Sequence, residues 1–174
     1  DGRADLASAT NDATGNGSVI YLTGNGNATF VNRGSFTTLQ ANVNDIAIGD
    51  LNNDGFQDVI TTSRSANTTS GGVSVLLNQF GTGFAPAIQQ DVDPPYGLQS
   101  VTLIDLNRDG YLDAVVGALA SGSDINQRPG NADNVFALFG VGDGTFQLPV
   151  PYLMGGDGTT SDSPTYVTIT DNPM

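Results

Sequence analysis

The sequence predicts an all-β fold. Glu and Lys, two of the strongest helix formers, are absent from the 174 residues, whereas Gly (23), Thr (18), Asn (16) and Ser (12) are abundant. Apolar residues gather in short β-branched runs that are separated by turn residues. The length of the chain and its hydrophobic fraction of 38% are sufficient for an ordered domain with a core.

A four-part pattern recurs along the chain, and each part predicts one strand with its connection. The first part is a β-run ending in Asp, at residues 45–50, 101–105 and 167–171. The second is an Asp-rich loop that leads into a short apolar run, at residues 50–60 and 105–116. The third is a run that begins at a turn, at residues 17–22, 72–77 and 134–139. A Gly-rich turn that closes on Phe30, Phe84 or Phe146 completes the repeat.

The spacing of the repeats identifies the architecture. Asp5, Asp58 and Asp113 end equivalent loops at intervals of 53 and 55 residues, and Asp50, Asp105 and Asp171 begin such loops at intervals of 55 and 66 residues. Four-stranded units of this length are typical of β-propellers. We therefore predict about three four-stranded blades of a β-propeller, as a partial propeller or as the repeat unit of a larger assembly. The predicted blades cover residues 1–49, 50–104 and 105–174, with the terminal loop split between residues 171–174 and 1–5.

The composition excludes several classes of function. Without His or Cys, the chain has no Ser-His-Asp or Cys-His catalytic set, no zinc site of the usual ligands and no disulfide. The net charge of −13 comes from 18 Asp and five Arg residues, and it disfavours binding to nucleic acid. No apolar run approaches the ~18 residues of a membrane span. Asp pairs can act in glycoside hydrolysis, but the clustered Asp residues are accounted for by metal binding, so we predict no enzyme.

The Asp-rich loops predict calcium sites. The pattern D-x-N-x-D-G-x-x-D occurs twice in full, and Ca²⁺ takes six to eight oxygen ligands from such alternating positions, with Gly at the sixth position for the sharp turn. The seventh position offers its backbone carbonyl. The predicted ligands of the first ion are Asp50, Asn52, Asp54, Phe56 (carbonyl) and Asp58, and those of the second are Asp105, Asn107, Asp109, Tyr111 (carbonyl) and Asp113.

Three alternatives to calcium sites between strands exist for these loops. An EF-hand needs flanking helices and a Glu at the twelfth position, where this chain has Thr61 and Val116 between predicted strands. Magnesium prefers a smaller octahedral shell with several waters. Two Asp-rich and Asn-rich turns without an ion are the remaining alternative.

The repeats resemble the FG-GAP/VCBS family of β-propeller blades, which occurs in integrin α-chain heads and in many secreted proteins, including some lectins. The residues that carry the resemblance are the two Asp loops, Phe139-Gly140, and the turns at residues 81–86 and 142–146. The resemblance covers nearly the whole chain. It implies calcium in the loop between the first two strands of each blade, an extracellular setting, and adhesion or carbohydrate binding as common roles.

The two ends of the chain match one further loop. Residues 171–174 correspond to positions one to four and residues 1–5 to positions five to nine, so that Asp171, Asp1, Arg3 (carbonyl) and Asp5 would form a third site. Pro173 stands where the other loops have an Asn ligand. A fragment of a longer chain and a unit that recurs, in tandem or as copies, both explain this match. Because propellers need four or more blades, we predict that the unit does not exist as an isolated monomer.

The remaining features carry weaker expectations. Phe30, Phe84 and Phe146 share one repeat position and are expected to pack between blades. Polar loops opposite the calcium loops could hold a glycan through Arg64, Tyr96, Asp124 and Arg128, although ordinary solvated loops explain the same residues. The sequons at Asn16, Asn27 and Asn67 are no more frequent than chance predicts.

The predicted function is a calcium-stabilised extracellular binding or adhesion module, with carbohydrate binding as one role. The alternatives are a structural repeat unit of a cell-surface or fibrous assembly and a non-catalytic accessory domain of a secreted enzyme. The expected partners are further blades, from the same longer chain or from identical copies, and a glycan or protein ligand.

Overall fold

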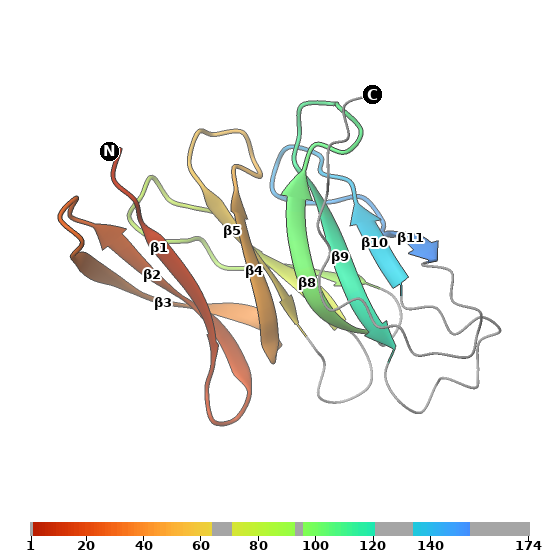
Figure 1. Cartoon of the computed structure of the whole chain (residues 1–174), viewed down its shortest axis with the longest axis horizontal. Helices are drawn as coiled ribbons and strands as arrows, with labels where there is room; N and C mark the ends of the chain where they lie inside the picture. The colour runs from red at the N-terminus through yellow and green to blue at the C-terminus, as the bar shows by residue number, and fades with distance from the viewer. Residues whose placement is uncertain (1, 64–70, 93–95, 121–133, 154–174) are drawn as a thin grey trace.

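The computed structural model describes residues 2–63, 71–92, 96–120 and 134–153, and all of its regular elements are β-strands. Three antiparallel sheets stand side by side in the order of the chain (Figure 1). This arrangement confirms the predicted all-β fold of blade-like sheets. In the described residues the sheets do not close into a ring, and no helix there is long and apolar enough to cross a membrane.

Two sheets have four strands and one has three. The first sheet contains β1 (Leu6–Asn11), β2 (Asn16–Gly24) and β3 (Phe30–Ala41). The second contains β4 (Val43–Gly49), β5 (Asp58–Ser63), β6 (Gly71–Leu76) and β7 (Ile88–Val92). The third contains β8 (Tyr96–Ile104), β9 (Asp113–Ala120), β10 (Asn134–Leu138) and β11 (Val150–Leu153).

Each four-stranded sheet begins one strand earlier than the predicted blade boundary. The predicted repeat boundaries at 49/50 and 104/105 fall in the loops that join β4 to β5 and β8 to β9. The Asp loops therefore connect the first two strands of a sheet, as the family resemblance implies. The first sheet starts with the strand that follows such a loop.

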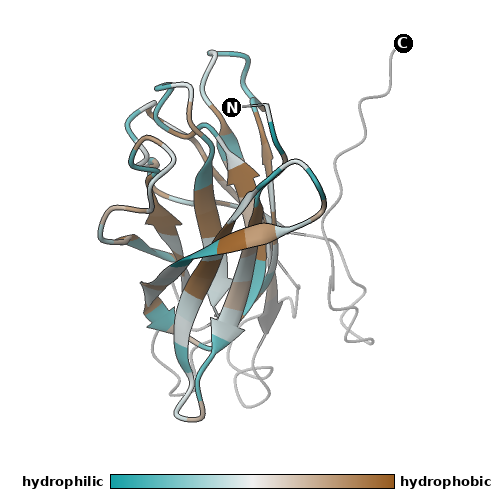
Figure 2. Ribbon diagram, turned by 90° about the vertical axis from the view of Figure 1, so that its left-hand side faces the viewer, coloured by the Kyte–Doolittle hydropathy of each residue, from teal (hydrophilic) through white to brown (hydrophobic). Residues whose placement is uncertain are grey.

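Two apolar clusters hold the sheets together. The larger one lies between the second and third sheets and includes Ile60, Leu98 and Val116. The smaller one joins the first sheet to the second, where Phe84 packs edge-on against Tyr21 and Phe36 at 5.2 Å between ring centroids. Figure 2 shows brown, apolar stretches along the strands and teal, polar residues in several of the loops.

The expectation for the three repeated Phe residues was right for two of them. Phe84 is buried and Phe146 packs on the larger core, but Phe30 is 39% exposed, so its predicted role in the core was wrong. Phe84 packs on the sheet that precedes its own in the chain. No sheet of the described residues precedes the first one, and Phe30 therefore has no such surface to cover it.

Candidate metal centre

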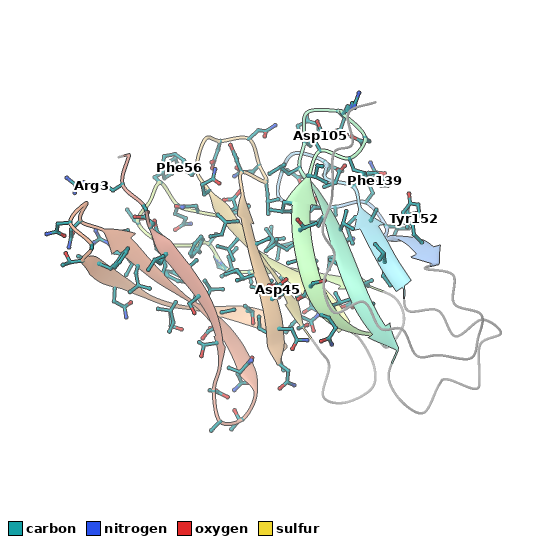
Figure 3. All side chains as sticks on the ribbon, viewed as in Figure 1. Arg3, Asp45, Phe56, Asp105, Phe139 and Tyr152 are labelled. Carbon is teal, nitrogen blue, oxygen red and sulfur yellow. The ribbon has the colours of Figure 1, made fainter. Side chains whose placement is uncertain are left out.

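The two complete Asp loops lie at the same end of neighbouring sheets, where Figure 3 labels Phe56 in the first loop and Asp105 in the second. The side-chain amide of Asn53 in the first loop donates a hydrogen bond to the backbone carbonyl of Gly110 in the second loop at 3.4 Å, so the two loops are in contact. Gly55 and Gly110, at the sixth position, have φ values of +87° and +91°. A side chain at this φ would be strained, which explains the Gly in both motifs.

The first loop is held by hydrogen bonds from its backbone to its own predicted ligands. The N–H of Asp54 lies 3.1 Å from Oδ1 of Asp50 and 3.1 Å from Oδ1 of Asn52. The N–H of Gly55 donates to the other oxygen of Asp50 at 2.9 Å, and the N–H of Phe56 donates to Asp54 at 2.8 Å. The Asn52 amide donates to Asp54 at 2.9 Å. The side-chain oxygens of positions one, three and five are thus gathered around one short stretch of backbone.

The second loop repeats this arrangement bond for bond. Asp109 N–H donates to Asp105 Oδ1 at 3.0 Å and to Asn107 Oδ1 at 2.9 Å. Gly110 N–H donates to Asp105 and Tyr111 N–H to Asp109, both at 2.9 Å. The Asn107 amide donates to Asp109 at 2.8 Å. The shared nine-residue pattern therefore determines the same local structure twice.

Asp58, at the ninth position, has a different environment from the loop residues before it. It is fully buried, and its two oxygens accept the N–H groups of Leu51 at 2.9 Å and Asn78 at 2.7 Å. Burial raises the pKa of the Asp58 carboxyl, while these two hydrogen bonds oppose that shift. Asp58 therefore braces the start of its loop against the end of the third strand.

Asp113 repeats this bracing role in the third sheet. It is also fully buried, and it accepts the N–H groups of Leu106 at 2.8 Å and Gly140 at 2.9 Å. The nine-residue pattern does not identify Asn78 and Gly140 as partners of the loops. Their one common signal is their place two residues after the third strand of each sheet.

The loop segment at the start of the chain contains half of the predicted third site. Asp5 accepts the N–H of Gly24 at 2.8 Å and the hydroxyl of Tyr21 at 2.7 Å, and unlike Asp58 it is exposed. Arg3 is exposed nearby. Asp1 and Asp171 lie outside the described residues, as do Arg64, Asn67, Asp124 and Arg128, and the side chain of Tyr96 is not described either.

Tyr21 provides a pH-dependent contribution to stability. Burial, together with its hydrogen bond to Asp5, raises the pKa of Tyr21 to about 12. Because the pKa is higher in the folded state, the contribution is complete below the ordinary Tyr pKa of about 10 and is lost as the pH rises toward 12. We expect the wild-type protein to lose more stability than Tyr21→Phe between pH 10 and 12 in denaturant titrations. Tyr111→Phe, at a 38% exposed position, is the control and should follow the wild type.

The donor set fits a hard cation by its chemistry, since positions one, three and five of both loops offer only oxygen ligands. Among the described residues, however, no three carboxylates are grouped closely enough to form a ready-made metal cage. In each loop the third carboxylate is the buried ninth-position Asp, whose oxygens accept backbone N–H groups. A carboxylate has about four lone-pair positions, so these bonds leave it further acceptor capacity.

Comparisons with known proteins identify the repeat. Residues 1–61 match the model of a family described as FG-GAP-like repeat. The chain is similar to integrin alpha-3 of Cricetulus griseus (35% identical over 81 residues), integrin alpha-3 of Mus musculus (33% over 81 residues) and integrin alpha-6 of Gallus gallus (35% over 81 residues). Each alignment covers 42% of this chain but only 8% of the integrin.

These matches name the FG-GAP repeat and do not test the VCBS part of the resemblance. The family match covers the first sheet and reaches through the first Asp loop into β5. The same loop geometry and the same bracing Asp then recur in the third sheet, beyond the matched residues. The repeat match, the similarity to integrin α chains and the blade-like sheets together support the resemblance of this chain to FG-GAP repeats.

Proposed function

We propose that the chain is a calcium-stabilised extracellular module for binding or adhesion. The observation that carries this proposal is the identical arrangement of the oxygen donors in two loops at one end of adjacent sheets. A turn between two strands can form without two carboxylates and a side-chain amide around one stretch of backbone. A hard divalent cation, in contrast, requires several oxygen ligands of this kind close together. The similarity to integrin α chains favours adhesion and a cell-surface setting over a catalytic role.

The residues proposed to hold the ions are those predicted from the pattern. Asp50, Asn52, Asp54 and the Phe56 carbonyl would bind the first ion, with Asp58 as both ligand and brace. The second ion would be bound by Asp105, Asn107, Asp109 and the Tyr111 carbonyl. Asp113 would bind this ion and also hold the loop through its buried hydrogen bonds. A third site would use Asp1, the carbonyl of Arg3, Asp5 and Asp171. Further blades would complete the assembly at this site. When bound, calcium would neutralise the carboxylates and tie the loop to the sheet.

A calcium titration by calorimetry tests the site assignment. We expect two equivalent sites per chain from the complete loops, and Asn52→Ala should weaken binding at one of them because an oxygen ligand is lost. Gln57→Ala is the matched control, since this exposed residue lies in the same loop between two proposed ligands. An absence of calcium binding, or an equal effect of both substitutions, would contradict the assignment.

The proposed partners are further blades, from the same longer chain or from identical copies, and a glycan or protein ligand. A structural repeat unit of a surface assembly is the second candidate function. It is favoured by the recurrence of one loop geometry in adjacent sheets, which is typical of a repeating unit.

A further inference from the structure

A cavity of about 610 Å³ lies between the first and second sheets, at the end of the sheets where Figure 3 labels Phe56. This volume is typical of ligand pockets, which span about 300–1,000 Å³. Its lining includes Tyr21, Thr23 and Arg33 of the first sheet and Phe56 and Phe80 of the second. The cavity therefore brings together aromatic and cationic side chains from two sheets.

Phe80 lies in the turn between β6 and β7 and has an unusual backbone conformation, with φ at +54°. It is the second residue after the amide that binds the buried ninth-position Asp, a place taken in the other sheets by Gly26 and Gly142, with φ at +79° and +82°. Gly adopts this region without strain, whereas a bulky residue adopts it at a cost. Strained residues of this kind are concentrated at ligand sites. The geometry of the turn favours Gly, so a role of the Phe80 ring itself has to explain the residue.

The ring of Phe80 is presented to solvent beside the cavity. Its side chain is 78% exposed, and it packs edge-on against Phe56 at 5.5 Å between ring centroids. In the third sheet a side chain at the equivalent Gly142 would collide with the ring of Tyr111. The aromatic pair of Phe56 and Phe80 is thus a feature of the second sheet, and exposed aromatic residues beside a pocket are typical of the anchor points of protein interfaces.

Arg33 brings a positive charge to the same cavity. It is the extra residue of a β-bulge in β3, opposite Tyr21 and Leu22, and bulges commonly redirect a side chain next to a functional site. Its Nε donates to the hydroxyl of Thr23 at 2.8 Å, which orients the guanidinium. Burial raises the pKa of Tyr21, and the nearby charge of Arg33 partly opposes this rise. The two terminal nitrogens of a guanidinium held in this way suit a bidentate carboxylate.

The charges around the cavity also favour an anionic group. The described lining residues include two cations, Arg3 and Arg33, and one acid, Asp5. Both oxygens of Asp5 already accept hydrogen bonds within the first sheet, from Tyr21 and Gly24. Two positive charges and one negative charge give a local net of +1 in a chain with a net charge of −13. An anionic ligand would be repelled by most of the molecule and attracted to this place.

We propose that this cavity binds a peptide segment of a partner protein in which an aromatic side chain stands next to an acidic one. The aromatic side chain would pack against Phe56 and Phe80, and the carboxylate would pair with Arg33. A peptide is the occupant we infer, because aromatic residues and Arg are the side chains enriched at protein interfaces. The inference rests on the proposed role of the chain as a binding or adhesion module, and it does not depend on calcium.

Tryptophan fluorescence tests the proposal, since the chain contains no Trp. The probe is the peptide acetyl-Gly-Asp-Trp-Gly-amide, added to the full chain. Burial of the indole should shift its emission to shorter wavelength, with a Kd below about 1 mM. The same peptide with Asn in place of Asp should bind about tenfold more weakly or worse, because a charge-assisted hydrogen bond is lost. The absence of a shift below about 1 mM, or equal binding of the two peptides, would overturn the proposal.

Two variants of the chain locate the binding. Arg33→Gln should weaken binding of the Asp peptide about tenfold or more, and Phe80→Gly should weaken it about two- to tenfold. Phe80→Gly should not lower the urea midpoint of unfolding, because Gly relieves the strained φ. The matched controls are Arg108→Gln, at an exposed position outside the cavity lining, and Tyr152→Ala, at a 49% exposed position. Unchanged binding in the two cavity variants, or an equal loss in the controls, would contradict the site.

A hexuronate trisaccharide tests the other class of anionic ligand. If it displaces the peptide at a lower concentration than acetyl-Gly-Asp-Phe-Gly-amide does, the ligand is a glycan and the peptide assignment is wrong. All measurements are to be made in EDTA and in calcium. Peptide binding in EDTA supports this inference even if calcium has no effect on stability, whereas calcium binding without peptide binding supports the metal sites and rejects this one. The two proposals can therefore fail separately.

Discussion

Replacing Asp58 with Ala is expected to lower the free energy of unfolding by about 2–6 kcal/mol, even in the presence of EDTA. The carboxylate is fully buried and accepts the N–H groups of Leu51 and Asn78. A buried donor left without an acceptor costs about 1–3 kcal/mol, and the substitution leaves two such donors. Urea denaturation, followed by a β-sheet signal, measures the loss.

The matched control for this prediction is Asp54→Ala in the same loop. Asp54 is exposed, and its carboxylate accepts hydrogen bonds only from within its own loop, from the Asn52 side chain and the Phe56 N–H. In EDTA this substitution should cost about 1 kcal/mol or less, which is the net value of an ordinary hydrogen bond. In calcium both variants should lose one metal site. If Asp58→Ala and Asp54→Ala lowered the free energy of unfolding equally in EDTA, Asp58 would not stabilise the fold through its buried hydrogen bonds.

Removal of calcium is expected to lower the melting temperature by about 10–20 °C. At a free concentration one hundred times Kd, each bound ion contributes about 2.7 kcal/mol, so two ions contribute about 5 kcal/mol. In a domain of this length, 1 kcal/mol corresponds to about 2–4 °C. Without calcium, the carboxylates of each loop lose their counter-ion and repel one another.

The measurement is a calorimetric scan in excess EDTA, followed by a scan after calcium is restored. Asp54→Ala and Asp109→Ala should each remove about half of the calcium-dependent increase, because each changes one loop. An unchanged melting temperature in EDTA would contradict the proposal that calcium stabilises the fold. Recovery with magnesium as complete as with calcium would contradict the choice of ion.

The parts of the fold that are determined by local chemistry could be predicted from the sequence. The turn at Gly55 and Gly110 requires a positive φ, and Gly is the residue that adopts it without strain. Alternating apolar runs then define the strands on either side. For these reasons the loops and the number of blade-like sheets could be predicted from the sequence, whereas the position of each loop between the first two strands of a sheet was implied by the family resemblance.

The parts that depend on distant residues could not be predicted. The pattern gives Asp50 and Asp58 the same role, but only the fold shows that Asp58 is buried against Asn78, 20 residues further along the chain. Phe30 occupies the same repeat position as Phe84, yet its exposure depends on whether another sheet covers it. The repeat period likewise does not specify where a sheet begins, which explains the offset of one strand.

The bonds within each acidic loop also affect how quickly an ion could enter and leave. The loop is ordered by its own backbone amides and by the buried Asp before any ion arrives, so the entropy of ordering it is lost during folding and not during binding. Ion exchange would then require only local side-chain rotation in an otherwise rigid receptor. Such pre-organisation would let the module respond to changing ion concentrations without unfolding, in contrast to small metal-dependent domains that fold only around their ion.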